Sequence, residues 1–126
     1  MHRSRLGGVI IDCRTEDIDG AAEFWSQALG LDLVQTTDPR DKNYIRLRTA
    51  SNDLDIEVQK VDHPSRVHID IETDDVVAEV RRLEALGAER IVEIRDWVVM
   101  QAPTGHRFCV VPVQRSGFAS EANRWN

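Results

Sequence analysis

The chain has 126 residues, enough for one domain that buries about two thirds of the surface its unfolded form exposes. An apolar fraction of 41% and a charged fraction of 30% are typical of a globular protein, and the net charge of -6 speaks against nucleic-acid and anionic-membrane partners. The two cysteines lack CxxC spacing and the first apolar run, residues 9–11, is too short for a signal sequence or membrane span, so we expect a cytoplasmic protein.

The first half of the chain reads as strand, helix and three strands. Residues 6–14 are rich in β-branched side chains and predict a strand. Asp17 is placed to cap a helix that ends at Gly30. Apolar residues recur along this helix at three- and four-residue steps, at Ile18, Ala22, Trp25 and Leu29. Further strands are expected at residues 31–37, 44–49 and 54–61, with a turn at residues 38–41.

The same order of elements returns after a linker at residues 62–65. A strand is predicted at residues 67–72, and alternation places Val67, Ile69 and Ile71 on the face that the next helix buries. Strands at residues 89–94, 97–101 and 107–113 follow that helix. The tail after Arg115 shows no hydrophobic periodicity. Its Phe118 and Trp125 are candidates to pack on the rest of the chain or on another subunit.

The second helix is predicted from a stripe of Val76, Val80 and Leu83. Thr73 or Asp74 is expected to cap it. Its outer face holds Glu79, Arg81, Arg82 and Glu84. Glu79 and Arg82 are one turn apart, so we expect a weak surface ion pair between them.

An internal repeat links the two halves. Residues 10–17 read IIDCRTED and residues 68–75 read HIDIETDD, and the two octets match at Ile11/Ile69, Asp12/Asp70, Thr15/Thr73 and Asp17/Asp75. Two equivalent modules are the simplest explanation. The first residue of the octet is Ile10 in the first copy and His68 in the second. Any chemistry of His68 therefore has no counterpart in the first module.

The strand face opposite the predicted helices is polar. It carries Asp12, Arg46, Glu57, Gln59, His68, Asp70 and Glu72. Burying so many polar groups without partners is costly, so we expect the half-sheets to curve around a polar hollow open to a ligand. Trp97 starts a strand beside Asp96 and is a candidate for the mouth of that hollow, where it would stack on a planar ligand.

Several motifs follow one another in a recognisable order. They are Phe24-Trp25 followed by Leu29-Gly30, His68 leading into Asp75, the helix end Leu83-x-x-Leu86-Gly87-Ala88, and the turn Ala102-Pro103-Thr104-Gly105-His106 before the last strand. Their order resembles the glyoxalase, bleomycin-resistance and dioxygenase superfamily, also called vicinal oxygen chelate proteins. The resemblance implies an α+β fold in which two βαβββ modules form a curved, cup-like mixed sheet. It implies a single domain over residues 1–126, with module one at about 6–61, module two at about 66–114 and a tail at 115–126. It also implies that the two modules pair either within the chain or across a dimer, and a homodimer is common among short members.

In metal-dependent members of this superfamily, each module supplies one ligand from its first strand and one from its last. Those positions fall here at Ile10, at Glu57 or Gln59, at His68 and at Cys109. Ile10 cannot bind a metal, and Cys109 stands where the family usually has Glu, so we interpret it as a small buried hydrophobe. An extradiol iron site needs two histidines and a carboxylate and is not expected. The alternative is a metal site shifted to Asp12, Glu57 and His68.

The polar candidates each have a structural alternative. His68 is either a metal ligand or general base, or a cavity-lining histidine bonded to Asp70 or Glu57. Glu57 is either a ligand or base, or a solvated strand carboxylate. Asp12 and Asp70 are expected to anchor an arginine, such as Arg46 or Arg66.

Arg46 is a further candidate with two interpretations. An arginine on the polar face is suited to bind an anionic substrate group such as a carboxylate. The alternative is an ordinary surface strand charge. Gln59 shares its face with Glu57 and is the other candidate for ligand contact on that strand.

Two functions follow from these candidates. The first is a glyoxalase-like protein that binds a small organic ligand in a polar cup around His68 and lacks the full metal-ligand set. The alternative is a lyase or isomerase in which zinc, nickel, manganese or iron polarises vicinal oxygens of the substrate and Glu57 moves a proton. The sequence leaves open whether the protein is an enzyme.

Overall fold

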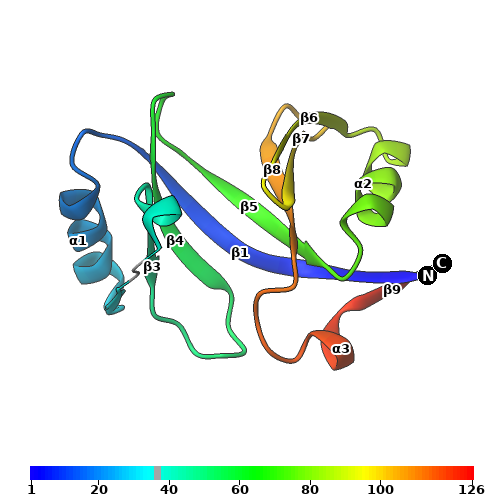
Figure 1. Ribbon diagram of the computed structural model, residues 1–126, viewed down its shortest axis with the longest axis horizontal. Coiled ribbons are helices and arrows are strands. Elements are labelled where there is room, and N and C mark those ends of the chain that lie inside the picture. Colours follow the sequence, from blue (N-terminus) through cyan, green and yellow to red (C-terminus); the bar gives the residue numbers. More distant parts are fainter. Residues whose placement is uncertain (36–37) are drawn as a thin grey trace. The chain divides into compact units, whose positions relative to one another are not determined.

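The computed structural model describes residues 1–35 and 38–126 of the chain, and its fold is α+β. The chain divides into two compact units. The N-terminal unit is Val9–Val67, and the C-terminal unit joins Met1–Gly8 to His68–Asn126. β1 (His2–Arg14) and β5 (Arg66–Thr73) therefore run through both units (Figure 1). None of the described helices is long and apolar enough to cross a membrane.

The N-terminal unit packs one helix on a small sheet. Its remaining elements are α1 (Ile18–Leu29), β2 (Leu33–Val34), the 3-10 turn η1 (Pro39–Asp41), β3 (Tyr44–Leu47) and β4 (Asp55–Val61). The strand order is β2-β3-β4-β1, and β2, β3 and β4 pair antiparallel. α1 lies against β3 and β4 (Figure 1). The strand predicted at residues 31–37 is shorter than expected, and its Thr36 and Thr37 lie outside the described residues.

The ends of α1 follow the sequence prediction. Oδ1 of Asp17 accepts the backbone N–H of Gly20 at 2.9 Å, which caps the first turn. Gly30 ends the helix in the left-handed conformation with φ of 69°. Ala22 is fully buried with Leu47 and Val58, and the Trp25 side chain packs on them. The predicted apolar stripe is wrong at Leu29, which is 46% exposed because it lies in the last turn beside the helix end.

The C-terminal unit packs a second helix on a larger sheet. Its remaining elements are α2 (Val76–Ala85), β6 (Glu89–Ile94), β7 (Trp97–Gln101), β8 (Arg107–Pro112), α3 (Phe118–Glu121) and β9 (Asn123–Trp125). The strand order is β1-β5-β8-β7-β6, with β9 paired antiparallel to the start of β1. β5 and β8 are parallel, whereas β8, β7 and β6 form antiparallel pairs.

The core of this unit lies between α2 and the sheet. Val80, Val98, Met100 and Val110 are buried there, and Ile71 packs against them. The prediction that Val67 and Ile69 lie beneath the helix is wrong, because they are 59% and 44% exposed. The reason is that α2 packs on β6, β7 and β8, which leaves the start of β5 uncovered.

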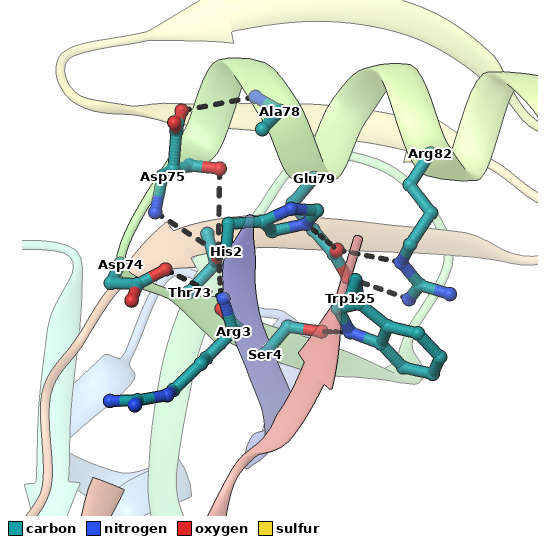
Figure 2. A network of polar contacts seen from close by, with 10 residues as sticks. All are labelled: His2, Arg3, Ser4, Thr73, Asp74, Asp75, Ala78, Glu79, Arg82 and Trp125. Carbon is teal, nitrogen blue, oxygen red and sulfur yellow. Dashed lines mark hydrogen bonds and ion pairs between the residues drawn. The ribbon is translucent and has the colours of Figure 1, made fainter. Parts of the chain in front are cut away.

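The residue that caps α2 lies one or two positions later than predicted. The cap is Asp75, whose Oδ1 accepts the N–H of Ala78 at 3.0 Å. Thr73 and Asp74 bind the start of β1 instead, since the Thr73 hydroxyl donates to the Arg3 carbonyl at 2.7 Å and Oδ1 of Asp74 accepts the Arg3 N–H at 2.8 Å. Figure 2 shows these contacts at the helix start. The two residues before the cap therefore hold the chain terminus in place.

Glu79 corrects a second prediction about α2, because its side chain points inward and is fully buried. Nε and Nη2 of Arg82 each lie 2.8 Å from the carboxylate, and Nε2 of His2 lies 2.8 Å from its Oε1 (Figure 2). Burial opposes ionisation of Glu79, but hydrogen bonds from Arg82, His2 and Ser4 outweigh it and hold its pKa below the ordinary value. The expected weak surface pair is therefore a buried ionic contact.

The tail is ordered, although its sequence shows no period. The Arg82 guanidinium lies 3.8 Å from the centre of the Trp125 ring, and the Trp125 indole N–H donates to Oγ of Ser4 at 2.8 Å (Figure 2). Phe118 is buried with the Arg5 guanidinium 5.4 Å from its ring. Both aromatic side chains of the tail thus dock on the C-terminal unit.

A second buried carboxylate fastens the chain just before the tail. Glu72 on β5 is fully buried and forms ion pairs with Nε of Arg115 at 2.8 Å and Nε of Arg5 at 3.3 Å. Its Oε1 accepts the N–H of Gln114 at 3.1 Å. Arg5 also donates to the carbonyl of Ser116 at 2.6 Å. The end of β5 is therefore bound both to the start of β1 and to the segment that leads into α3.

Candidate functional site

Three metal-binding side chains meet where β5 and β8 run side by side. The parallel register places Asp70 beside Cys109, and His68 lies two residues before Asp70 on the same face of β5. Nε2 of His68 is 3.5 Å from Oδ1 of Asp70. One ligand atom from each of the three residues lies within 4.8 Å of the other two. This group is called the HDC cluster below.

The carboxylate of Asp70 is the unusual member of the HDC cluster. The residue is 8% exposed, and its buried Oδ1 accepts no hydrogen bond from the described part of the chain. The 3.5 Å separation from the His68 ring is too long for a good hydrogen bond. A buried carboxylate oxygen without a donor is costly in an apo protein, and a cation would remove that cost.

The donor set fits a divalent metal. Imidazole nitrogen, carboxylate oxygen and thiolate sulfur are all zinc ligands, and three protein ligands leave a position open for water or substrate. Imidazole also suits nickel and iron, whereas manganese prefers oxygen donors. The HDC side chains stand on two paired strands, which fix their spacing. The residues present therefore fit zinc best among the metals considered.

Cys109 is the member expected from sequence to be a small buried hydrophobe, and its exposure of 9% fits that expectation. Its backbone position opposite Asp70 nevertheless brings the thiol into ligand range. Local sequence carries no signal for that pairing, because β5 and β8 are separated by a helix and two strands. The superfamily resemblance did point to this position.

Asp12 has the structural partner that the sequence analysis expected. It is 2% exposed, and its Oδ2 lies 3.7 Å from Nε of Arg66 within the N-terminal unit. The arginine side chain is about half exposed. Asp70, its counterpart in the repeat, faces His68 in place of an arginine. The matched aspartates therefore have different neighbours in the two modules.

Arg46 and Glu57 are also neighbours. They occupy directly opposed positions of the β3–β4 hairpin, with Nε of Arg46 3.7 Å from Oε1 of Glu57. Gln59 lies opposite Tyr44 and donates to its hydroxyl at 3.0 Å. The polar face of the N-terminal unit is thus built from cross-strand pairs. Its Arg46 charge is partly neutralised by Glu57.

An open cavity of about 780 Å³ adjoins this polar face within the N-terminal unit. Its walls include Arg14, Gln59, Lys60 and His63. Nζ of Lys60 is 3.6 Å from the exposed carboxylate of Glu16, which also lines the cavity. Gln59 is the one residue shared by this cavity and the set of site residues predicted from sequence.

Trp97 begins β7 and is partly buried. The Arg95 guanidinium lies 5.5 Å from the centre of its ring, close enough for a cation–π contact. Arg95 occupies the turn between β6 and β7 with φ of 51°, a left-handed conformation that costs a non-glycine residue free energy. The predicted aromatic candidate therefore sits against a strained cationic turn.

Comparisons with known proteins agree on the fold. A family model described as a glyoxalase-like domain matches residues 8–111. A hypothetical protein from Bacillus halodurans is similar in structure, with a TM-score of 0.65 and 14% identity over 90% of this chain and 97% of that one. A methylmalonyl-CoA epimerase from Mycobacterium tuberculosis gives a TM-score of 0.63 and 17% identity over 91% of both chains.

A further methylmalonyl-CoA epimerase, solved in complex with methylmalonyl-CoA and NH4+, gives a TM-score of 0.62 and 15% identity over 92% of this chain and 97% of that one. At such low identity these likenesses speak for the fold alone. No curated protein matches the sequence.

Proposed function

Because the chain belongs to the glyoxalase-like domain family, within the vicinal oxygen chelate superfamily, we propose that it binds a small oxygen-bearing organic molecule at the HDC cluster. The observation that supports this most directly is the buried Oδ1 of Asp70, which lies beside His68 and Cys109 and accepts no hydrogen bond from the residues that the structure describes. A polar group of a ligand, or a cation that the ligand shares, would satisfy that oxygen.

His68, Asp70 and Cys109 would hold a divalent metal, with zinc the best match to their donors. When bound, such an ion polarises a substrate oxygen as a Lewis acid. A metal binds the neutral imidazole, the carboxylate and the thiolate forms of these three side chains. The strand pairing of β5 with β8 orients the three donors before the ligand arrives.

The second candidate function is a metal-dependent isomerase or lyase. The three-donor set favours it, because a catalytic metal needs an open position. Two structural neighbours are methylmalonyl-CoA epimerases, which is consistent with chemistry at a carbon beside a carbonyl. In this version Glu57 is the proton carrier, as the family resemblance implies, and its Oε1 lies 3.7 Å from Nε of Arg46.

Metal analysis of the purified protein separates these possibilities from a purely structural cluster. We expect stoichiometric metal after supplementation with zinc, and its loss in His68→Ala. His106→Ala is the matched control, because His106 is exposed and its Nδ1 contacts Thr104 at 2.7 Å. Failure to bind any of zinc, nickel, manganese or iron would remove the metal-dependent function, and equal loss in both variants would show that His68 is no ligand.

Catalysis is then tested by proton exchange. If the protein is an isomerase or lyase, metal-loaded protein will exchange the hydrogen beside the carbonyl of a 2-substituted thioester in deuterated water, and Glu57→Gln will abolish that exchange. Metal binding without hydrogen exchange would contradict the isomerase or lyase and would support the small-molecule binding function.

We also propose a homodimer in the cytoplasm, as superfamily membership suggests. Both Cys13 and Cys109 are free thiols, which suits a reducing compartment. Sedimentation equilibrium at micromolar concentration should give a mass near twice the 14.3 kDa of one chain. A mass of one chain at all concentrations would contradict the dimer.

A further inference from the structure

One row of side chains crosses the sheet of the C-terminal unit from the HDC cluster to its edge. Asp70 on β5 is opposite Cys109 on β8, which is opposite Val99 on β7, which is opposite Val92 on β6. Residues directly opposed on neighbouring strands lie on the same face of a sheet. The polar cluster and the two valines therefore belong to one continuous surface.

Two further apolar side chains extend this surface. Ile94 is opposite Trp97, and each lies two residues along its strand from a valine of the row, so both share its face. Val92 and Ile94 are 46% and 41% exposed. Val92, Ile94, Trp97 and Val99 are together called the apolar strip.

The apolar strip is separate from the hydrophobic core of the unit. The core side chains Val98, Met100, Phe108 and Val110 alternate with it along β7 and β8 and lie under α2. The strip therefore belongs to the face opposite the helix. Exposed apolar side chains gathered beside a polar cluster are typical of a small-molecule site, where a few polar groups fix orientation and apolar walls bind the rest.

On the basis of the proposed function, we infer that the ligand is amphiphilic. Its oxygen-bearing head binds at the HDC cluster, and an uncharged, planar or aliphatic body lies over the apolar strip. Two strand spacings of roughly 4.8 Å separate Cys109 from Val92, so the strip accommodates a body of about 10 Å. A charged body would lose its hydration against the valines without gaining a partner there.

The turn between β6 and β7 supports this assignment. Arg95 adopts its strained conformation with the guanidinium 5.5 Å from the Trp97 ring. A two-residue β-hairpin loop requires a positive φ at a central residue, and Arg95 occupies that position. The turn places the cation near the aromatic ring at the end of the strip, where the ring offers a flat wall for a planar body.

A matched pair of hydroxamates tests the inference. Acetohydroxamate and benzohydroxamate have the same chelating head and differ in the apolar body. We expect zinc-supplemented wild-type protein to bind benzohydroxamate roughly tenfold more tightly by calorimetry, and Val92→Thr to lower the ratio of the two affinities by about three- to tenfold. Val77→Thr is the control, because Val77 is an apolar residue of α2 with 55% exposure, away from the strip.

The possible failures are distinguishable. Equal affinity for the two hydroxamates, or an unchanged ratio in Val92→Thr, would overturn the amphiphilic ligand while the proposed function stands. Failure to bind either hydroxamate would overturn both. β6 is the last strand of the order, so a second chain is the competing occupant of the strip. A dimer that Val92→Thr dissociates without any change in the affinity ratio would assign the strip to that interface and overturn the inference.

Discussion

The carboxylate of Asp70 lies beside the thiol of Cys109 in the parallel pair of β5 and β8, and its Oδ1 is 3.5 Å from Nε2 of His68. This relationship combines two features that rarely persist without a function. The oxygen is buried without a hydrogen-bond donor in the described chain, and its two neighbours are both metal ligands by chemistry. A buried oxygen without a donor lowers the stability of the metal-free protein, and a bound cation would remove that cost.

Asp70→Asn tests whether this carboxylate destabilises the metal-free protein and binds the metal. We expect the metal-free protein to keep its stability or gain about 1 kcal/mol, because the substitution removes a buried charge at constant shape. The rise in melting temperature that zinc causes in wild type should disappear in the variant. Thermal unfolding with and without zinc measures both effects. A metal-free variant that loses several kcal/mol would show that the charge has a structural role.

Glu79 predicts how stability depends on pH. Its pKa in the folded chain lies below its ordinary value of 4.5, so the unfolded state takes up a proton first as the pH falls. The stabilisation is therefore complete above about pH 4.5 and is lost as the pH falls through the lower, folded pKa. Urea unfolding between pH 7 and pH 3 should record this loss.

Glu79→Gln should cost about 3 kcal/mol at pH 7, because it leaves the Arg82 charge without its buried partner. The variant should also lose less stability than wild type when the pH is lowered. Glu84→Gln is the control on the same helix, where the side chain is exposed. Equal costs for the two substitutions would contradict the buried ionic contact.

The tail contact of Trp125 should contribute to the stability of the C-terminal unit. Trp125→Ala removes the ring under Arg82 and the hydrogen bond to Ser4, and we expect a loss of about 2 kcal/mol in urea unfolding. Arg124→Ala, one position earlier and exposed, should change stability by less than about 0.5 kcal/mol. A tail that detaches freely would make both variants indistinguishable from wild type.

Glu72 predicts a stronger effect of the same kind. Glu72→Gln removes the charge that faces both Arg5 and Arg115, and we expect a loss of about 3 to 5 kcal/mol. Glu89→Gln on the exposed strand β6 is the control. Hydrogen exchange should show the added opening at residues 112–121, since Glu72 accepts the Gln114 N–H. Protection unchanged there would contradict the fastening role of Glu72.

Periodicity predicted the helices and the succession of strands along the chain, because those features depend on local sequence. Glu79 is a residue whose orientation was predicted wrongly from the sequence. The residue lies three positions after Val76 and four before Leu83, so helical spacing places it on the inward stripe, and only its charge argued for the outer face. Its partner His2 is 77 residues away in sequence, and no local pattern reveals such a contact.

The site was only partly visible for the same reason. Alternation along β5 predicts that His68 and Asp70 share one polar face. Cys109 joins them through a pairing of distant strands, which alternation cannot determine. The exposure of Val67 and Ile69 likewise depends on how far α2 extends over the sheet. The tail elements, of four and three residues, are too short to show a period.

The most direct test of the metal-binding cluster is the absorption spectrum of the cobalt(II)-loaded protein. Thiolate bound to cobalt(II) gives a charge-transfer band in the near ultraviolet, and we expect that band in wild type and in Cys13→Ser, because Cys13 lies outside the cluster. It should vanish in Cys109→Ser. A wild-type spectrum without the band, or a band that survives in Cys109→Ser, would contradict a site made of His68, Asp70 and Cys109.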